Sequence, residues 1–282
     1  MATTEHRPTE RVLDILELLS NSEDGMTLTE LSKALNAPKS SIMPLVHTMT
    51  ARNFIYMQKN TLRYFIGVAT YSVGITYNNR KTSLQFIQQE MSNITTQTNE
   101  TCQLGIQSRN MVLYIAKKEA PQPIRLMSSV GKQLPLYCTG LGRALLAYKS
   151  EEEIRSLFPE VLTAYTPHTL ATVDDLIKEL ELTRQRGYAL EHEETNLMVN
   201  CIAVSLDYNN APIAALSVSI PTFRISGEKE KEVVQILCAI KIPSSKASIP
   251  TRASARKTDI FTLSAVPSSS SRAFPCLKVT TW

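Results

Sequence analysis

Several absences narrow the class of protein. No run of apolar residues comes near the ~18 that a membrane-spanning helix needs. The start of the chain, MATTEHRP, lacks the apolar run of a secretory signal, so we expect a cytoplasmic protein. The five cysteines form no Cys-x-x-Cys pair, and the four histidines show no metal-ligand spacing. We therefore expect reduced thiols, no metal site and no cofactor.

Acidic residues are missing from one long window of the sequence. Residues 31–89 contain seven Lys or Arg and no Asp or Glu. Residues 90–240 carry 14 basic and 18 acidic side chains, a net charge of −4, so the overall charge of +4 hides a segregated distribution. A cationic surface attracts polyanions, and the phosphate backbone of DNA is the commonest such partner. The window therefore predicts double-stranded DNA as a partner of the N-terminal segment.

The same region contains a helix-turn-helix pattern. Residues 10–19 place apolar side chains at helical spacing, and a second helix is expected from Thr27, with Glu30 in capping-box register. Residues 36–38, Asn-Ala-Pro, make the turn, and a third helix is expected over residues 39–52. Its buried side chains are expected to be Ile42, Leu45, Val46 and Met49.

Two β-prone runs follow the third helix. Residues 54–57 and 61–65 surround a polar turn, which predicts a hairpin and so a winged helix-turn-helix domain over residues 1–67. Residues 68–81 are expected to form a linker helix that leads out of this domain.

The outward-facing residues of the third helix are the candidates for contact with DNA, because this helix lies in the major groove in such domains. Its serines can donate hydrogen bonds to phosphate or base, and two arginines can meet the flanking backbone. The predicted DNA-binding residues are Lys39, Ser40, Ser41, Met43, His47, Thr48, Arg52 and Arg63. The alternative is that these are solvated residues without a partner.

From about residue 82 the pattern changes to mixed helices and strands, which predicts an α+β domain on an antiparallel sheet up to residue 240. Helices are expected over residues 84–97, 142–148, 151–158, 173–186 and 228–240. Strands are expected over residues 101–107, 111–117, 124–127, 188–191, 200–207 and 212–220, the last two joined around Asn209 and Asn210.

The last segment, residues 241–282, is different again. It is rich in Ser and Pro and holds seven basic residues against one acidic residue. No apolar periodicity is present, so we expect a disordered basic tail. A natural extension and a shifted reading frame both explain its abrupt onset.

Several motifs resemble the IclR-type bacterial transcriptional regulators, over about residues 10–240. The N-terminal matches are LTELS from Leu28, PKSS from Pro38 and YFIG from Tyr64. The C-terminal matches are LPLYCTGLGRALLA from Leu134, RGYA from Arg186, Glu193-Glu194, CIA from Cys201 and AALSVS from Ala214. The resemblance implies a winged-helix DNA-binding domain, a linker helix and a GAF-like effector-binding domain. It also implies homodimers that pair into homotetramers on DNA.

By the same resemblance, the effector pocket is lined at Gly140, Leu141, Glu191, Val199, Cys201, Ser217 and Ser219. Hydroxyls, backbone N–H groups and one carboxylate suit a small organic or sugar acid as the effector. The segment before the helix at residue 142 is also a candidate anion site, because the first N–H groups of a helix lack internal partners. The alternative for Cys201, Ser217 and Ser219 is that they are small core residues.

Three residues depart from the family pattern. Pro44 lies inside the third helix, where it removes one hydrogen bond and costs about 3 kcal/mol if fully interior. Glu191 stands where relatives usually have Asp, and Met198 where they often have Gly. We therefore borrow neither the operator sequence nor the identity of the effector from relatives.

Two rival functions remain. Cys138 could act as a nucleophile before a helix, with His168 or His192 as its base, but buried cysteines are mostly inert and we expect no enzyme. A DNA-binding regulator without a small-molecule ligand is the second. The preferred hypothesis is a ligand-responsive repressor of a catabolic operon.

Overall fold

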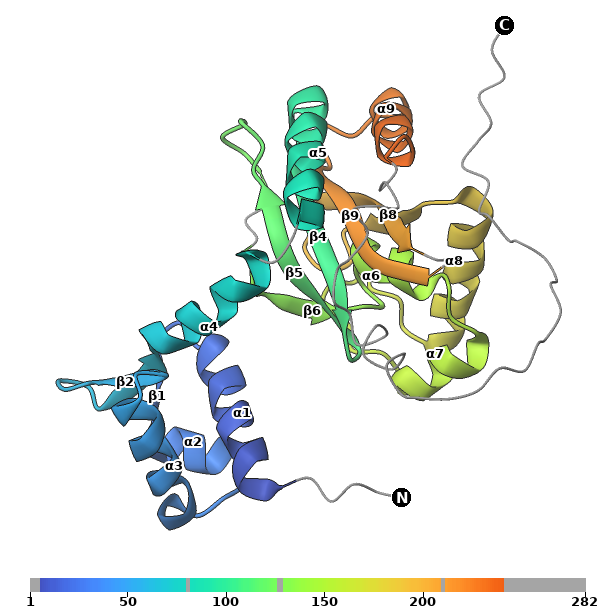
Figure 1. The fold of residues 1–282 in the computed structure, drawn as a ribbon. Coiled ribbons are helices and arrows are strands. Elements are labelled where there is room, and N and C mark those ends of the chain that lie inside the picture. Colours follow the sequence, from blue (N-terminus) through green and yellow to red (C-terminus); the bar gives the residue numbers. More distant parts are fainter. Residues whose placement is uncertain (1–5, 80–81, 126–128, 209–210, 241–282) are drawn as a thin grey trace, which may run out of the picture. The chain divides into compact units, whose positions relative to one another are not determined.

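The computed structural model describes residues 6–79, 82–125, 129–208 and 211–240. The chain divides into two compact units, Met1–Arg80 and Lys81–Trp282, and each is described by itself. Figure 1 shows a small helical unit and a larger unit built on a sheet. The predicted basic tail, residues 241–282, lies outside the described residues.

Three helices and a small sheet form the first unit. The helices are α1 (Arg7–Ser20), α2 (Leu28–Ala34) and α3 (Lys39–Ala51), as the helical spacing predicted. The predicted hairpin is β2 (Ile55–Gln58) with β3 (Arg63–Ile66). A strand that the sequence pattern did not reveal, β1 (Met26–Thr27), pairs with the other side of β3 and extends the wing to three strands.

Local signals and a small apolar core hold this unit together. The Thr27 hydroxyl accepts the N–H of Glu30, and the Glu30 carboxylate accepts the N–H of Thr27 at 2.8 Å, so the predicted capping box is present. Gly67 directly follows the wing, and this position requires glycine because a Cβ there would lie 2.2 Å from the carbonyl oxygen of Asn53. The core packs three helices against the wing through Ile15, Leu19, Leu31, Ala37, Ile42, Val46, Met49 and Ile55. Helix α4 (Val68–Asn79) follows, where the sequence pattern predicted a helix.

The second unit is a three-layer α+β domain. Its described part holds an antiparallel sheet in the order β6-β5-β4-β9-β8-β7. The strands are β4 (Thr101–Ser108), β5 (Met111–Lys118), β6 (Gln133–Pro135), β7 (Ala189–His192), β8 (Val199–Tyr208) and β9 (Ala211–Pro221). The helices are α5 (Thr82–Thr98), α6 (Gly140–Leu146), α7 (Glu151–Leu157), α8 (Val173–Arg186) and α9 (Gly227–Cys238).

Each face of the sheet carries its own core. Helices α5 and α9 cover one face, and α6, α7 and α8 lie on the other (Figure 1). Helix α8 begins at the predicted cap, where the Thr172 hydroxyl accepts the N–H of Asp175, and ends at Gly187, whose φ of 82° favours glycine. The pocket described below lies on the α6 side of the sheet.

Two predictions in this unit were wrong. Ile124 and Arg125 are irregular, and the rest of the strand predicted at residues 124–127 lies outside the described residues. The strand that pairs with β5 is instead β6, which has three residues. Helix α6 begins at Gly140, two residues before the predicted start, because Thr139 provides its N-cap. The predicted turn residues Asn209 and Asn210 lie outside the described residues.

Within the described ranges, no helix combines the length and apolar character needed to cross a bilayer. The same residues hold no cluster of three or more His, Cys, Asp or Glu side chains that could bind a metal ion.

Candidate functional sites

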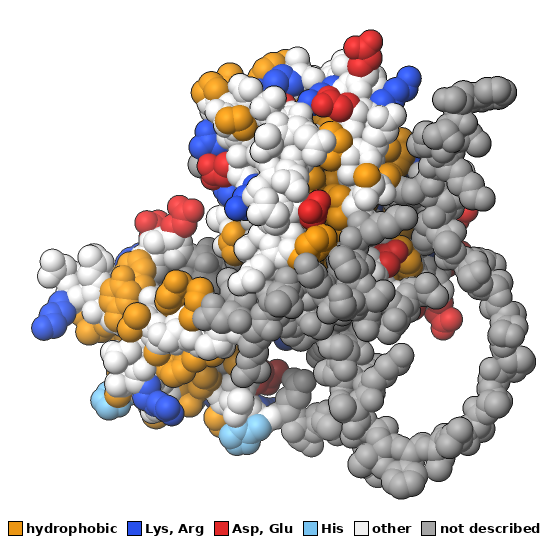
Figure 2. All heavy atoms as spheres, turned by 45° about the horizontal axis from the view of Figure 1, so that its top comes forward, with side chains coloured by type: hydrophobic (Ala, Val, Ile, Leu, Met, Phe, Trp, Pro, Cys, Tyr) orange, Lys and Arg blue, Asp and Glu red, His pale blue; other side chains and the backbone are white. Residues whose placement is uncertain are grey.

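Helix α3 presents a polar face to solvent, opposite its buried stripe. Ile42, Val46 and Met49 are buried beneath it. The exposed residues include the predicted DNA contacts Lys39, Ser40, Met43, His47 and Thr48. Met43 is 50% exposed, so an apolar side chain is also available to a partner. Figure 2 shows basic, histidine and hydrophobic side chains on the surface of the N-terminal unit.

Two of the predicted hydroxyl contacts also bond within the helix. The half-buried Ser41 donates to the carbonyl of Pro38 at 2.7 Å, and Thr48 donates to the carbonyl of Pro44 at 2.8 Å. A phosphate only accepts hydrogen bonds, so it would compete with these carbonyls for the two hydroxyl protons. This competition makes Lys39, Ser40 and His47 the more direct candidates.

Pro44 is accommodated inside α3, which runs without interruption from Lys39 to Ala51. Its ring is exposed, and proline has no N–H to donate to the carbonyl four residues earlier, that of Ser40. The first turns of this helix therefore make one backbone hydrogen bond fewer beside the candidate base-reading side chains.

The two predicted phosphate contacts lie in different environments. Arg52 is exposed at the C-cap of α3. Arg63 on β3 is half-buried and donates to the carboxylate of Glu30 at 3.1 Å and to the carbonyl of Gly25 at 2.8 Å. Hydrogen bonds from Thr27, together with the Arg63 charge, lower the pKa of Glu30. A phosphate contact by Arg63 would therefore compete with an existing ion pair.

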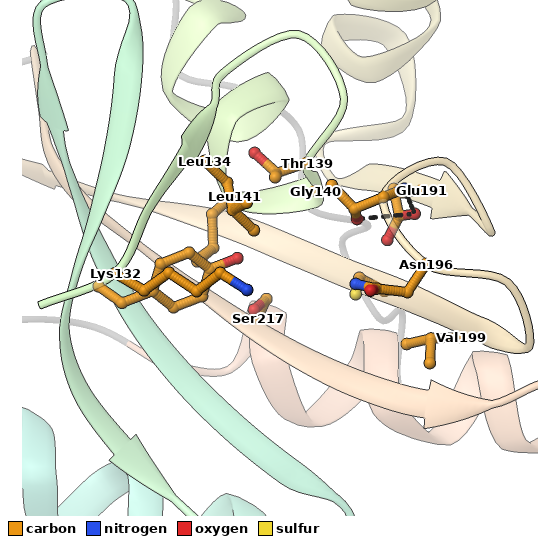
Figure 3. A pocket seen from close by; sticks show the side chains of 12 residues that line it. Lys132, Leu134, Thr139, Gly140, Leu141, Glu191, Asn196, Val199 and Ser217 are labelled. Carbon is orange, nitrogen blue, oxygen red and sulfur yellow. Dashed lines mark hydrogen bonds between the residues drawn. The ribbon is translucent and has the colours of Figure 1, made fainter. Parts of the chain in front are cut away.

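A pocket lies where the N-terminal end of α6 meets strands β5, β7, β8 and β9 (Figure 3). The space between its lining atoms, open solvent at the mouth included, is about 460 Å³. Of the predicted residues, Gly140, Leu141, Glu191, Val199, Cys201 and Ser217 line it. The sequence pattern missed the remaining lining residues, which are Tyr114, Lys132, Leu134, Thr139, Thr195 and Asn196.

Ser219, the seventh predicted residue, lies behind the pocket wall. Its hydroxyl is 3.2 Å from the sulfur of Cys201 and donates to the side-chain oxygen of Gln103 at 3.1 Å. The same Gln103 oxygen accepts from Ser217 at 3.2 Å. Gln103 is buried in β4, so one amide orients both serines of the neighbouring strand β9.

Two glycines let helix α6 approach the sheet closely. A Cβ on Gly140 would lie 3.3 Å from the Cβ of Cys201, and one on Gly142 would lie 2.1 Å from the carbonyl oxygen of Leu136. Thr139 caps the helix by accepting the N–H of Gly142 at 3.1 Å. The Thr-Gly-Leu-Gly motif therefore brings the start of α6 against β8 and forms one wall of the pocket.

Glu191 is a buried carboxyl that is already engaged by the loop after β7. Its Oε1 accepts the N–H of Glu194 at 2.6 Å and that of Thr195 at 3.3 Å. Burial raises the pKa of Glu191, although hydrogen bonds from Cys201 and from these N–H groups oppose the rise. Glu191 therefore orders the loop that carries two other pocket residues, Thr195 and Asn196.

A buried ion pair fastens the same loop to α6. The Arg143 guanidinium donates to the Glu194 carboxylate, to the carbonyl of Tyr137 at 3.1 Å and to that of Leu190 at 2.8 Å. Arg143 and Glu194 are 2% and 4% exposed, so each charge depends on the other for compensation. The sequence contains an indication of a buried charge here, since Arg143 is the charged residue in an otherwise apolar helix.

The cysteines near the pocket are poor nucleophiles. Cys138 is buried and donates to the carbonyl of Pro135 at 3.7 Å, and burial raises the pKa of its thiol to about 12. Burial also raises the pKa of Cys201 well above its ordinary value. Because the thiolate is the reactive form, this environment opposes the Cys-dependent chemistry considered above.

Comparison with known proteins agrees with this architecture. The IclR helix-turn-helix domain model matches residues 8–58, and the model of the bacterial transcriptional regulator IclR C-terminal domain matches residues 77–242. The transcriptional repressor AllR of Salmonella typhimurium is 30% identical over 222 residues, which cover 78% of this chain and 82% of AllR. The regulator KdgR of Dickeya chrysanthemi is 28% identical over 80% of this chain and 75% of KdgR.

The fold agrees with that of a solved regulator. The crystal structure of an IclR transcriptional regulator from Alicyclobacillus acidocaldarius has a TM-score of 0.75 and 27% identity, covering 83% of this chain and 95% of that chain. A helix-turn-helix unit followed by an α+β unit with a pocket defines a DNA-binding transcriptional regulator. The chain belongs to the IclR family of bacterial transcriptional regulators.

Proposed function

We propose that this chain is a repressor whose affinity for its operator is changed by a small organic or sugar acid that its operon serves to break down. The observation that carries the proposal is a pocket lined by hydroxyl, amide and charged groups, in a different unit from the exposed polar face of α3. The names of two relatives support it, since AllR is called a repressor and KdgR a regulator.

In this proposal α3 enters the major groove. Lys39, Ser40, Met43 and His47 meet bases or phosphates there, and Arg52 meets the flanking backbone. A homodimer, or a pair of dimers, reads a partly palindromic operator. Effector binding shifts the equilibrium between a DNA-competent and a DNA-incompetent arrangement, and α4 transmits the shift. The size of the shift is set by the difference in effector affinity between the two arrangements.

The test uses the full chain and the DNA upstream of its own gene. Fluorescence anisotropy at several salt concentrations should give an affinity that falls steeply with salt, because binding releases counterions from phosphate. Adding sugar acids and aromatic acids one at a time should change the affinity for one of them. Salt-sensitive binding without any ligand response would support a regulator that senses no small molecule, and no binding to any duplex would contradict the proposal.

A further inference from the structure

The effector pocket has charged groups of opposite sign at its two sides. Among the described residues that line it, Lys132 is the cationic side chain and Glu191 the acidic one. Figure 3 shows Lys132 reaching along the pocket on the side of Ser217, while Glu191 and Asn196 lie on the other side. A ligand in this space therefore meets a positive charge at one end and a carboxyl group at the other.

Lys132 is held at the pocket by its backbone although its side chain is exposed. The carbonyl of Lys132 accepts the N–H of Tyr114 at 3.0 Å, and the N–H of Gly131 donates to the carbonyl of Tyr114 at 2.8 Å. The next residue begins β6, which pairs with β5. These bonds fix the position of the Lys132 backbone, and the flexible side chain then brings its ammonium group to the pocket.

The Lys132 side also offers a hydroxyl donor, that of Tyr114. Tyr114 lines the pocket, and burial raises its pKa, so its hydroxyl remains protonated. Ser217 lines the same region, but its hydroxyl proton is already donated to Gln103, so Tyr114 is the more direct hydroxyl donor. A carboxylate, which only accepts hydrogen bonds, can be bound by an ammonium group and a phenol hydroxyl together.

The Glu191 side opposes an anion. A carboxylate placed there would approach the buried carboxyl of Glu191, whose Oε1 already accepts the backbone N–H groups of Glu194 and Thr195. Like charges at close range in a buried site repel strongly. Hydroxyl groups are acceptable on this side, because they can donate to Glu191 or to the side-chain oxygen of Asn196 and accept from the Asn196 amide.

We propose that Lys132 is the residue that recognises the carboxylate of the effector, and that it orients a hydroxy acid with its hydroxyl-bearing end toward Glu191 and Asn196. This inference rests on the proposed function, and it names the recognition residue and the direction of the ligand. It assigns the anion to the β5–β6 side of the pocket rather than to the start of α6.

The experiment measures binding of matched small molecules to the full chain by calorimetric titration. The probes are glycerate and gluconate, their uncharged amides glyceramide and gluconamide, and propionate and hexanoate, which lack the hydroxyls. The protein variants are wild type, Lys132→Met, Lys132→Arg and Lys178→Met. Lys178 on α8 is an exposed lysine paired with Asp175 and provides the matched control for loss of one charge.

Wild type should bind at least one hydroxy acid about tenfold more tightly than its amide, the typical worth of a hydrogen bond to a charged group near a surface. Lys132→Met should abolish that preference, while Lys132→Arg and Lys178→Met retain it. The acid without hydroxyls should bind more weakly than the hydroxy acid in every variant.

The outcomes separate this inference from the function on which it rests. An acid that binds wild type and Lys132→Met equally well overturns the role of Lys132 and leaves a ligand-responsive regulator intact. Failure of every acid to bind wild type overturns the inference, while the proposed function is tested separately by anisotropy with operator DNA and the wider set of acids. Equal binding of acid and amide to wild type also overturns the inference.

Discussion

The two units of this chain differ in where their polar side chains lie. In the described residues, every buried polar or charged side chain belongs to the second unit, and the core of the first unit is apolar throughout. The candidate DNA contacts on α3 are mostly exposed to solvent and contribute little to the packing of the unit. The pocket residues, in contrast, also hold the fold together, as Glu191, Ser217 and Thr139 do. Function and stability should therefore separate in the first unit and be coupled in the second.

The largest effect is expected from Arg143→Met. It leaves Glu194 buried without its cationic partner, and breaking a buried pair in this way costs about 3–5 kcal/mol of unfolding free energy. Scanning calorimetry should show a lower melting temperature for the transition of the second unit. Arg155→Met is the control, because Arg155 makes exposed ion pairs with Glu151 and Asp174 and should change this transition far less. Similar losses in both variants would contradict the distinction.

In the first unit, His47→Ala should reduce operator affinity while leaving the melting temperature nearly unchanged. His47 is exposed on α3, so its loss should cost stability no more than about 0.5 kcal/mol. Loss of a base contact costs about 1–3 kcal/mol of specific affinity. Anisotropy with operator and with unrelated duplex provides the check, since affinity for the unrelated duplex should stay the same. A large stability loss would mean that function and folding are coupled here as well.

Glu191→Gln should alter how the stability of the second unit depends on pH. The folded protein raises the pKa of Glu191 above its ordinary value of 4.5, so the folded state holds the proton more tightly than the unfolded chain. The contribution of Glu191 to the free energy of unfolding is fully present below the ordinary pKa. It is lost as the pH rises through the raised pKa of the folded state. Wild type should therefore lose stability over this window, and the variant should lose less. Parallel curves from calorimetry at a series of pH values would show that Glu191 does not titrate in this way.

The smallest effect is a gain expected from Gly74→Ala in α4. A Cβ at Gly74 meets no described atom within 4 Å, and alanine favours a helix over glycine by about 1 kcal/mol. Circular dichroism should show a small increase in thermal stability. Gly142→Ala gives the opposite case, because its Cβ would collide with the carbonyl oxygen of Leu136, and it should destabilise the second unit.

The sequence predicted the first unit well because its signals are local. The capping box at Thr27, the buried stripe of α3 and the glycine after the wing each depend on residues close in sequence. The pairing of Arg63 with Glu30 could not be predicted, because it joins residues 33 positions apart across β3 and α2. A count of charged residues along the sequence cannot tell such a paired arginine from one that is available to bind DNA.

In the second unit, the walls from α6, β7, β8 and β9 followed from the family resemblance, and six predicted residues do line the pocket. The remaining lining residues could not be read from the sequence. Strand β6 has three residues, too few to give an alternating pattern. The sequence therefore did not predict this strand or the position of Lys132, which directly precedes it. Thr195 and Asn196 lie in an irregular loop whose shape depends on Glu191 and Arg143.

Gln103 has a consequence for how relatives of this protein diverge. Its single acceptor oxygen sets the direction of two hydroxyls on the adjacent strand, yet the residue itself lies beneath the pocket floor. Exchanging it for a side chain with different acceptors would rotate those hydroxyls and change the selectivity of the proposed effector site without altering any residue that lines the pocket. Searches for new ligand preferences by directed evolution should therefore include this concealed position.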